Sequence, residues 1–309
     1  MGSTSAAGFA PRIQRLGTAK PAAWAAWFPL VVLAGLALAI RPKLPAWGFM
    51  WALGFAIYGG FKWLTWWRAR DLAAEAGVGR SVGYLLLWPG IDARTFLSSG
   101  VRPPKPTTFQ WALAIGKTAF GIVLFWGLAR LIPADHALSV GWVGLLGLIF
   151  LLHFGPFHIA ALAWQSAGVD AKVIMRAPAL ATSLNDFWSN RWNLAFRQLA
   201  HDLVLRPLHR RLGVVGAGLV AFVASGLAHE LVISLPAGAG YGLPTAYFVL
   251  QGLGMLFERS RPGRGLGLAR GLRGWLFAAA VTGGPAYWLF HPAFVTQVIL
   301  PFMRAVGAL

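Results

Sequence analysis

An ionisable pair interrupts one of the most apolar stretches of this sequence. His229 and Glu230 lie within the run Val214–Ile233, and ionisable side chains inside such runs usually face a cavity or a partner. Burial disfavours the imidazolium, so His229 is expected to stay neutral and able to accept a proton. Ser225 precedes it by one turn, and Glu230 points about 100° away around a helix. The pattern predicts a neutral histidine that can accept a proton and faces a cavity or a partner, with a histidine hydrogen-bonded between helices as the alternative. Glu230 either pairs with an arginine or marks the end of the span.

A second polar group lies in Ser183–Arg211. Drawn as one helix, this stretch carries a polar stripe opposite an apolar face that contains Trp188 and Trp192. The stripe consists of Asp186, Asn190, Asn193, Arg197 and His201. Ser183 is expected to cap the helix start, and replacing Asn193 by Ala is expected to leave folding nearly intact. The alternative is an ordinary interfacial helix with its tryptophans among lipid headgroups.

The elements that position these residues must be membrane helices. Of 309 residues, 57% are hydrophobic and 12% are charged, a share of charge about half that of soluble domains. One soluble core cannot hide so much apolar surface. We therefore predict an all-α, polytopic membrane bundle of about seven or eight spans plus interfacial or re-entrant helices. The predicted spans are 22–40, 45–61, 110–131, 139–164, 212–234, 243–257 and 273–290, and the apolar segment 292–309 either spans the membrane or lies in its interface.

The predicted organisation is a polar tail over 1–20 followed by one membrane-embedded domain over 21–309. Within it, a motif helix over 183–211 leads into a histidine span over 212–234. A signal peptide is the alternative for the first span. Most of the 27 Lys and Arg residues fall in the tail and in 61–109, 166–211 and 258–273, so these segments and the N-terminus are assigned to the cytoplasm. The composition favours a bacterial inner membrane.

Several kinds of chemistry and partner are excluded or disfavoured. The chain has no cysteine, which excludes an acyl-cysteine intermediate and cysteine metal sites. No Gly-x-Ser-x-Gly elbow is present. His153 and His158 flank Pro156 and do not align as metal ligands, so no metal site is predicted. The net charge of +18 belongs to loops between spans, which disfavours a nucleic-acid partner and favours membrane lipid headgroups.

The segment Phe187-Trp-Ser-Asn-Arg-Trp-Asn193 resembles the Phe-Trp-x-x-Arg-Trp-Asn signature of the membrane-bound O-acyltransferase superfamily, in its wax synthase branch. Ser225–Glu230 is similar to the histidine span of that family, and Tyr84–Arg94 to an upstream segment of the same branch. Ser189 stands where a glycine is common. The resemblance covers roughly residues 80–260.

The resemblance implies acyl transfer from acyl-coenzyme A to the hydroxyl of a long-chain or other lipid alcohol, with no further cofactor. It carries the catalytic roles over to His229 and Asn193. Residues expected to contact substrates are Asp186, Trp188, Asn190, Arg191, Trp192, Arg197, Ser225 and Glu230. Arg191 and Arg197 are candidates for the coenzyme phosphates, although Arg191 could equally pair with Asp186. The alternatives are a transporter or channel that uses His229 as a polar point, and an O-acyltransferase with a non-lipid acceptor. The oligomeric state stays open.

Overall fold

The computed structural model describes residues 24–309, and every regular element in that range is helical. The polar tail predicted over 1–20 lies outside the described residues. The longer helices are α1 (Trp24–Ala39), α2 (Ala46–Arg68), α6 (Thr108–Ile122), α8 (Ala137–Ile149), α9 (Pro156–Ser166), α12 (Arg206–His229), α14 (Leu243–Arg259) and α16 (Gly271–Gly283). The shorter α-helices are α3 (Arg70–Ala76), α4 (Val78–Val82), α5 (Ala93–Leu97), α7 (Ala129–Leu131), α10 (Leu184–Asp186), α11 (Leu194–Ala200), α13 (Leu235–Ala237), α15 (Arg261–Gly265), α17 (Ala286–Leu289), α18 (Pro292–Phe294) and α19 (Leu300–Ala305).

Three helical segments of the described chain are long and apolar enough to cross a membrane. They are Thr108–Leu131, Ala137–Ser166 and Leu194–Ala237; Gly271–Leu289 and Pro292–Ala305 add a fourth if this pair, bent by 60°, counts as one span. The predicted all-α class is confirmed, whereas the predicted count of seven or eight spans is not. The expected spans 22–40 and 243–257 form α1 and α14, which are shorter helices of 16 and 17 residues.

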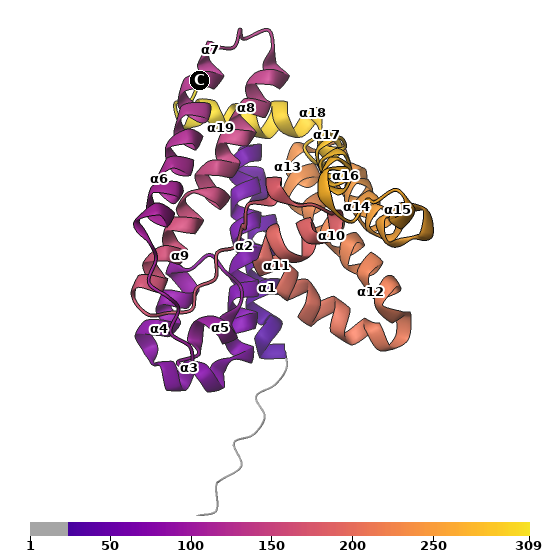
Figure 1. Cartoon of the computed structure of the whole chain (residues 1–309). Coiled ribbons are helices and arrows are strands. Elements are labelled where there is room, and N and C mark those ends of the chain that lie inside the picture. Colours follow the sequence, from indigo (N-terminus) through magenta and orange to yellow (C-terminus); the bar gives the residue numbers. More distant parts are fainter. Residues whose placement is uncertain (1–23) are drawn as a thin grey trace, which may run out of the picture.

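Two large apolar clusters organise the bundle. The first joins α8, α14 and the C-terminal helices, and α19 lies across one end of α8 (Figure 1). The second joins the α2–α5 region to α9 and α11. Trp188 packs against the first cluster, while Ala195 and Leu199 belong to the second. The predicted motif segment therefore bridges the two clusters.

Glycines of α8 let neighbouring helices approach closely. A Cβ on Gly141 would lie 2.2 Å from Val295, and one on Gly144 equally close to the Met303 sulfur. Small residues serve this purpose in membrane bundles.

Gly213 bends the long segment that leads to His229. Its φ is +66°, a backbone conformation that only glycine adopts without cost.

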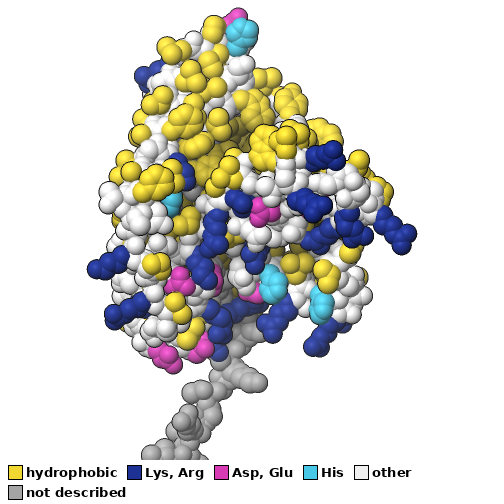
Figure 2. Space-filling view, viewed as in Figure 1, with side chains coloured by type: hydrophobic (Ala, Val, Ile, Leu, Met, Phe, Trp, Pro, Cys, Tyr) yellow, Lys and Arg dark blue, Asp and Glu magenta, His cyan; other side chains and the backbone are white. Residues whose placement is uncertain are grey.

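Charge is unevenly distributed over the surface. Figure 2 shows Lys and Arg side chains gathered over the lower half and one flank of the molecule, whereas hydrophobic side chains cover the upper half. Such a distribution is typical of a protein with one end in lipid and the other at a charged surface.

Candidate active site

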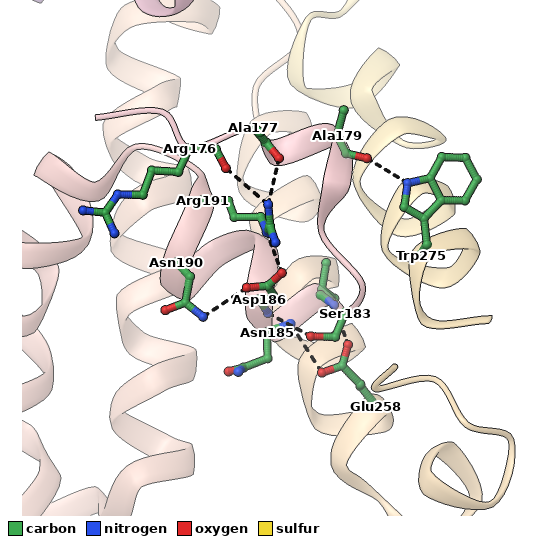
Figure 3. Close-up of polar contacts among 11 residues, drawn as sticks. Arg176, Ala177, Ala179, Ser183, Asn185, Asp186, Asn190, Arg191, Glu258 and Trp275 are labelled. Atoms are coloured by element: carbon green, nitrogen blue, oxygen red, sulfur yellow. Dashed lines mark hydrogen bonds and ion pairs between the residues drawn. The ribbon is translucent and has the colours of Figure 1, made fainter. Parts of the chain in front are cut away.

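The first half of the predicted motif helix is held by a network around Asp186 (Figure 3). Ser183 caps α10 by accepting a hydrogen bond from the Asp186 amide at 2.9 Å. The Asp186 carboxylate accepts from Asn190 at 3.1 Å and pairs with Arg191. Arg191 also donates to the carbonyls of Arg176 and Ala177 at 3.4 and 3.2 Å. Burial raises the pKa of Asp186, but the hydrogen bonds from Arg191 and Asn190 outweigh it and hold this pKa below its ordinary value.

A carboxylate from α14 secures the same segment from the other side. Glu258, 2% exposed, accepts hydrogen bonds from the Leu184 and Asn185 amides. These amides belong to the first turn of a helix, where backbone donors lack partners of their own. Arg191 and Glu258 thus fix the motif segment to the 176–177 loop and to α14.

The predicted continuous helix over 183–211 is wrong. A π-helical turn at Phe187–Arg191 ends at Trp192, which is extended, and Asn193 adopts the left-handed conformation at φ 42° before α11 begins. Asn193 caps α11 by accepting from the Phe196 amide at 3.4 Å. The polar stripe is therefore split between two helices, and among the described residues Asp186 and Asn190 are its only two members joined by a side-chain hydrogen bond. The premise behind the expectation for Asn193→Ala, a residue on the surface stripe of one continuous helix, does not hold, because Asn193 is the N-cap of α11; the effect of the substitution on folding stays a prediction.

The backbone amide and the Nδ2 group of Asn193 are the atoms relevant to its predicted catalytic role. Its backbone amide points at the Met175 sulfur, 3.1 Å away. Its Nδ2 group makes no hydrogen bond to any residue in the described range 24–309. The side chain is half-buried, so this amide donor is free to meet a ligand. No hydrogen bond among the described residues joins Asn193 to His229.

Trp188 connects the motif to the histidine. Its ring lies 5.8 Å from the Phe248 ring, which lies 4.5 Å from the His229 ring, centroid to centroid. The Trp188 indole donates to Gln251 at 3.3 Å, and Gln251, 0% exposed, donates to the Val281 carbonyl. Trp188 is thus locked in place beside the residue that touches His229. Trp192 instead stacks on Phe187, with ring centroids 5.4 Å apart.

The orientation of His229 fixes its tautomer. Nδ1 lies 2.7 Å from the Ser225 carbonyl oxygen. A carbonyl only accepts, so Nδ1 carries the hydrogen and the lone pair of the neutral ring is on Nε2. Nε2 makes no hydrogen bond within the described part of the chain. The ring is half-buried and presents a free proton acceptor.

The two predicted neighbours of His229 face elsewhere. The Ser225 hydroxyl donates to the Ala221 carbonyl at 2.9 Å, so Ser225 meets His229 through its backbone alone. Glu230 does not pair with an arginine in the described structure: its Oε1 accepts hydrogen bonds from Gly242 and Thr245. The substrate-binding roles expected for these two residues stay predictions.

A cavity of about 220 Å³, called here the basic cavity, lies beside α11. Lys172, Arg176 and Arg197 line it together with Asp92 and Asp170, and Lys172 lies 4.0 Å from Asp170. Arg197 is exposed and donates to the Ser189 carbonyl. His229 is not among the lining residues, so the cavity and the histidine are separate parts of the structure.

Three residues at the site were not predicted. Phe248 is one of many apolar residues in the predicted span 243–257, and no sequence signal distinguishes it from the others. Gln251 is a polar side chain inside the predicted span 243–257, which is a signal for a buried hydrogen bond. Lys62 was counted as a cytoplasmic loop residue; instead it lies in α2, 2% exposed, and donates to the carbonyls of Trp88 and Gly90 at 2.9 and 2.7 Å.

Comparison with known proteins agrees with the motif. Residues 172–250 match the membrane bound O-acyl transferase family, and this range contains both Asn193 and His229. The chain is 35% identical over 151 residues to a long-chain-alcohol O-fatty-acyltransferase of Simmondsia chinensis, covering 44% of this chain and 42% of that protein. It is 34% identical over 143 residues to a probable long-chain-alcohol O-fatty-acyltransferase of Arabidopsis thaliana, covering 42% and 39%. An Arabidopsis acyl-CoA–sterol O-acyltransferase is 40% identical over 62 residues, 18% of each chain.

The resemblance to the membrane-bound O-acyltransferases is thereby confirmed, and within them the wax synthase-like branch. The chain spans less than half the length of the curated relatives it matches. The match to this family and the apolar helices together indicate an integral membrane protein.

Proposed function

We propose that the protein transfers a fatty acyl group from acyl-coenzyme A to the hydroxyl of a long-chain or other lipid alcohol. One observation carries the proposal: His229 donates its Nδ1 hydrogen to the Ser225 carbonyl and keeps its Nε2 lone pair free. Its ring contacts Phe248, which in turn contacts Trp188 of the 187–193 motif. A neutral imidazole in this state is a general base. The names of the relatives support a lipid alcohol as acceptor.

The proposed reaction needs one proton acceptor and one oxyanion donor. Nε2 of His229 takes the alcohol proton as the alcohol oxygen attacks the thioester carbonyl, and an oxyanion forms. The amide Nδ2 of Asn193 is the proposed donor to that oxyanion. The intermediate collapses: the new C–O ester bond remains, the C–S bond breaks, and the coenzyme thiolate receives the proton from His229. No covalent enzyme intermediate is needed.

The acyl donor is proposed to enter from the cytoplasmic side. Lys172, Arg176 and Arg197 line a cavity whose charge suits phosphate groups, and the positive-inside rule assigns segment 166–211 and the N-terminus to the cytoplasm. Trp188 and Trp192 are proposed to border the acyl chain. A bacterial inner membrane stays a prediction from composition; the relatives named above come from plants.

The test uses purified protein with an acyl-coenzyme A and a long-chain alcohol, following ester and free thiol together. We expect His229→Ala and His229→Gln to lose about 10²–10⁴-fold in turnover, the usual worth of general-base catalysis, while acyl-coenzyme A still binds. His209→Gln is the matched control, because His209 is exposed at the other end of α12. Near-normal turnover by His229→Gln would refute the base assignment.

Separate arms of the assay address the alternatives. A sterol acceptor is included because of the sterol-acylating relative, and a small polar alcohol represents a non-lipid acceptor. No ester from any acceptor, together with no binding of the thioester, would favour a transporter or channel over an enzyme.

A further inference from the structure

The N-terminus of α14 is capped by a side chain from a different helix. Its own N-cap residue is Gly242, at φ +88°, which offers no side chain. Instead Glu230 Oε1 accepts from the Gly242 amide at 3.0 Å, from the Thr245 amide at 3.0 Å and from the Thr245 hydroxyl at 2.9 Å. First-turn amides need such partners, and a carboxylate there also meets the positive end of the helix dipole.

This cap lies where α12 and α14 approach closely. A Cβ on Gly226 would lie 2.6 Å from the Thr245 Cα, so the two backbones touch at the residue that Glu230 binds. Glu230 follows His229 directly, and Phe248 follows Thr245 by three residues. The contact between Phe248 and His229, at 4.5 Å, is therefore on the same helix pair, within one turn of the cap.

We infer that Glu230 is a positioning residue: by capping α14 it holds the Phe248 ring against His229 and so keeps Nε2 of His229 aimed at the acceptor hydroxyl. The inference rests on the proposed function, in which His229 is the base. Three donors on one oxygen give Glu230 a fixed geometry, and the proton transfer itself needs nothing from it. Phe248 and Ser225 then restrain the imidazole from two sides.

The prediction for catalysis is a change in turnover without a change in donor binding. Misplacing a reacting group by about 1 Å costs up to about 10²-fold in rate. We expect Glu230→Ala to lower kcat by up to about 10²-fold and to leave KM for acyl-coenzyme A unchanged, because the basic cavity is built from other elements. Glu230→Gln keeps a carbonyl oxygen for the cap and should recover much of the lost kcat.

A double-mutant cycle separates positioning from general damage. If Glu230 acts through Phe248, Glu230→Ala should cost much less in a Phe248→Ala background than in the wild type. Independent losses in the two variants would contradict the inference. Equal loss of kcat in Glu230→Gln and Glu230→Ala would also overturn it, because the proton or the charge of the carboxylate would then be what matters.

Hydrogen exchange gives a readout that does not depend on catalysis. Glu230→Ala should accelerate exchange of the Gly242 and Thr245 amides, whereas Glu230→Gln should keep them protected. Accelerated exchange with undiminished kcat in an active enzyme would overturn the positioning role and leave the proposed function standing. If the wild type makes no ester while its amides are protected, the proposed function fails and the positioning role falls with it, although the cap itself is then established.

Discussion

Substituting Asn193 separates its structural role from its chemical one, because three replacements change different properties. Asn193 is left-handed, caps α11 through its side-chain oxygen and keeps its Nδ2 group free. Asp preserves the left-handed tolerance and the capping oxygen but has no amide donor. Gly accepts the backbone conformation and loses the whole side chain. Ala loses the side chain and is strained as well.

The structure gives the expected size of each effect. Loss of an N-cap to Ala costs about 0.5–2 kcal/mol, and to Gly only a few tenths. Left-handed backbone costs a residue with a Cβ about 1–2 kcal/mol. Asn193→Ala is therefore expected to be the least stable variant, with Asn193→Gly and Asn193→Asp close to the wild type. All three lack the amide donor, so turnover should fall by about 10²–10³-fold in each.

The assay combines thermal unfolding in detergent with ester formation at saturating substrates. The expected pattern is loss of turnover in all three variants and loss of stability in Asn193→Ala alone. Wild-type turnover in a well-folded Asn193→Asp would refute the oxyanion role and leave Asn193 as a cap only. An Asn193→Ala variant as stable as the wild type would refute the claim that the left-handed backbone and the N-cap at Asn193 contribute to stability.

Two further predictions concern ionisable side chains that are partly or fully buried. Asp186→Asn should lower the unfolding temperature at neutral pH, since the pKa of Asp186 is held below its ordinary value by Arg191; this stabilisation is present above the ordinary pKa and lost as pH falls through the lower, folded one. Equal unfolding temperatures at pH 7 would contradict it. Lys62→Met should lower the free energy of unfolding by about 1–3 kcal/mol, because it leaves the buried Gly90 carbonyl without its donor. It should also weaken acyl-coenzyme A binding, because Gly90 lines the basic cavity. Exposed Lys43→Met is the control in both measurements, and unchanged unfolding of Lys62→Met would contradict the assigned hydrogen bonds.

Hydrophobic runs and the motif were enough to predict the helical class, several of the helices and the family. The apolar run that contains His229 was recognisable because a single ionisable pair stands out against lipid-compatible residues. The break of the segment 183–211 at Asn193 was not predictable in the same way. Helical periodicity describes residues that share one backbone conformation, and a single left-handed residue resets the phase. Asn193 itself was the available signal, since Asn favours both left-handed positions and N-caps.

Contacts between distant helices lay beyond the sequence. For Glu230 the sequence suggested an arginine partner or the end of the span, yet backbone amides at the start of α14 donate to its Oε1. Lys62 falls in the segment 61–109, which the distribution of basic residues assigns to the cytoplasm, yet backbone carbonyls bind it in the interior. In both cases the partner is main chain, which has the same chemistry at every residue. A sequence therefore shows that a charge needs a partner without showing that the backbone will supply it.

The left-handed break is a consequence of the two clusters that the motif joins. Trp188 is committed to the cluster around α14, where Gln251 holds its indole, and Ala195 and Leu199 are committed to the cluster around α9. One straight helix would tie both groups to a single axis, whereas the turn at Asn193 lets each half pack on its own cluster. A strained residue persists where its surroundings determine it from both sides. The same turn leaves the Asn193 amide uncommitted, so the packing that breaks the helix also frees the donor that the proposed reaction uses.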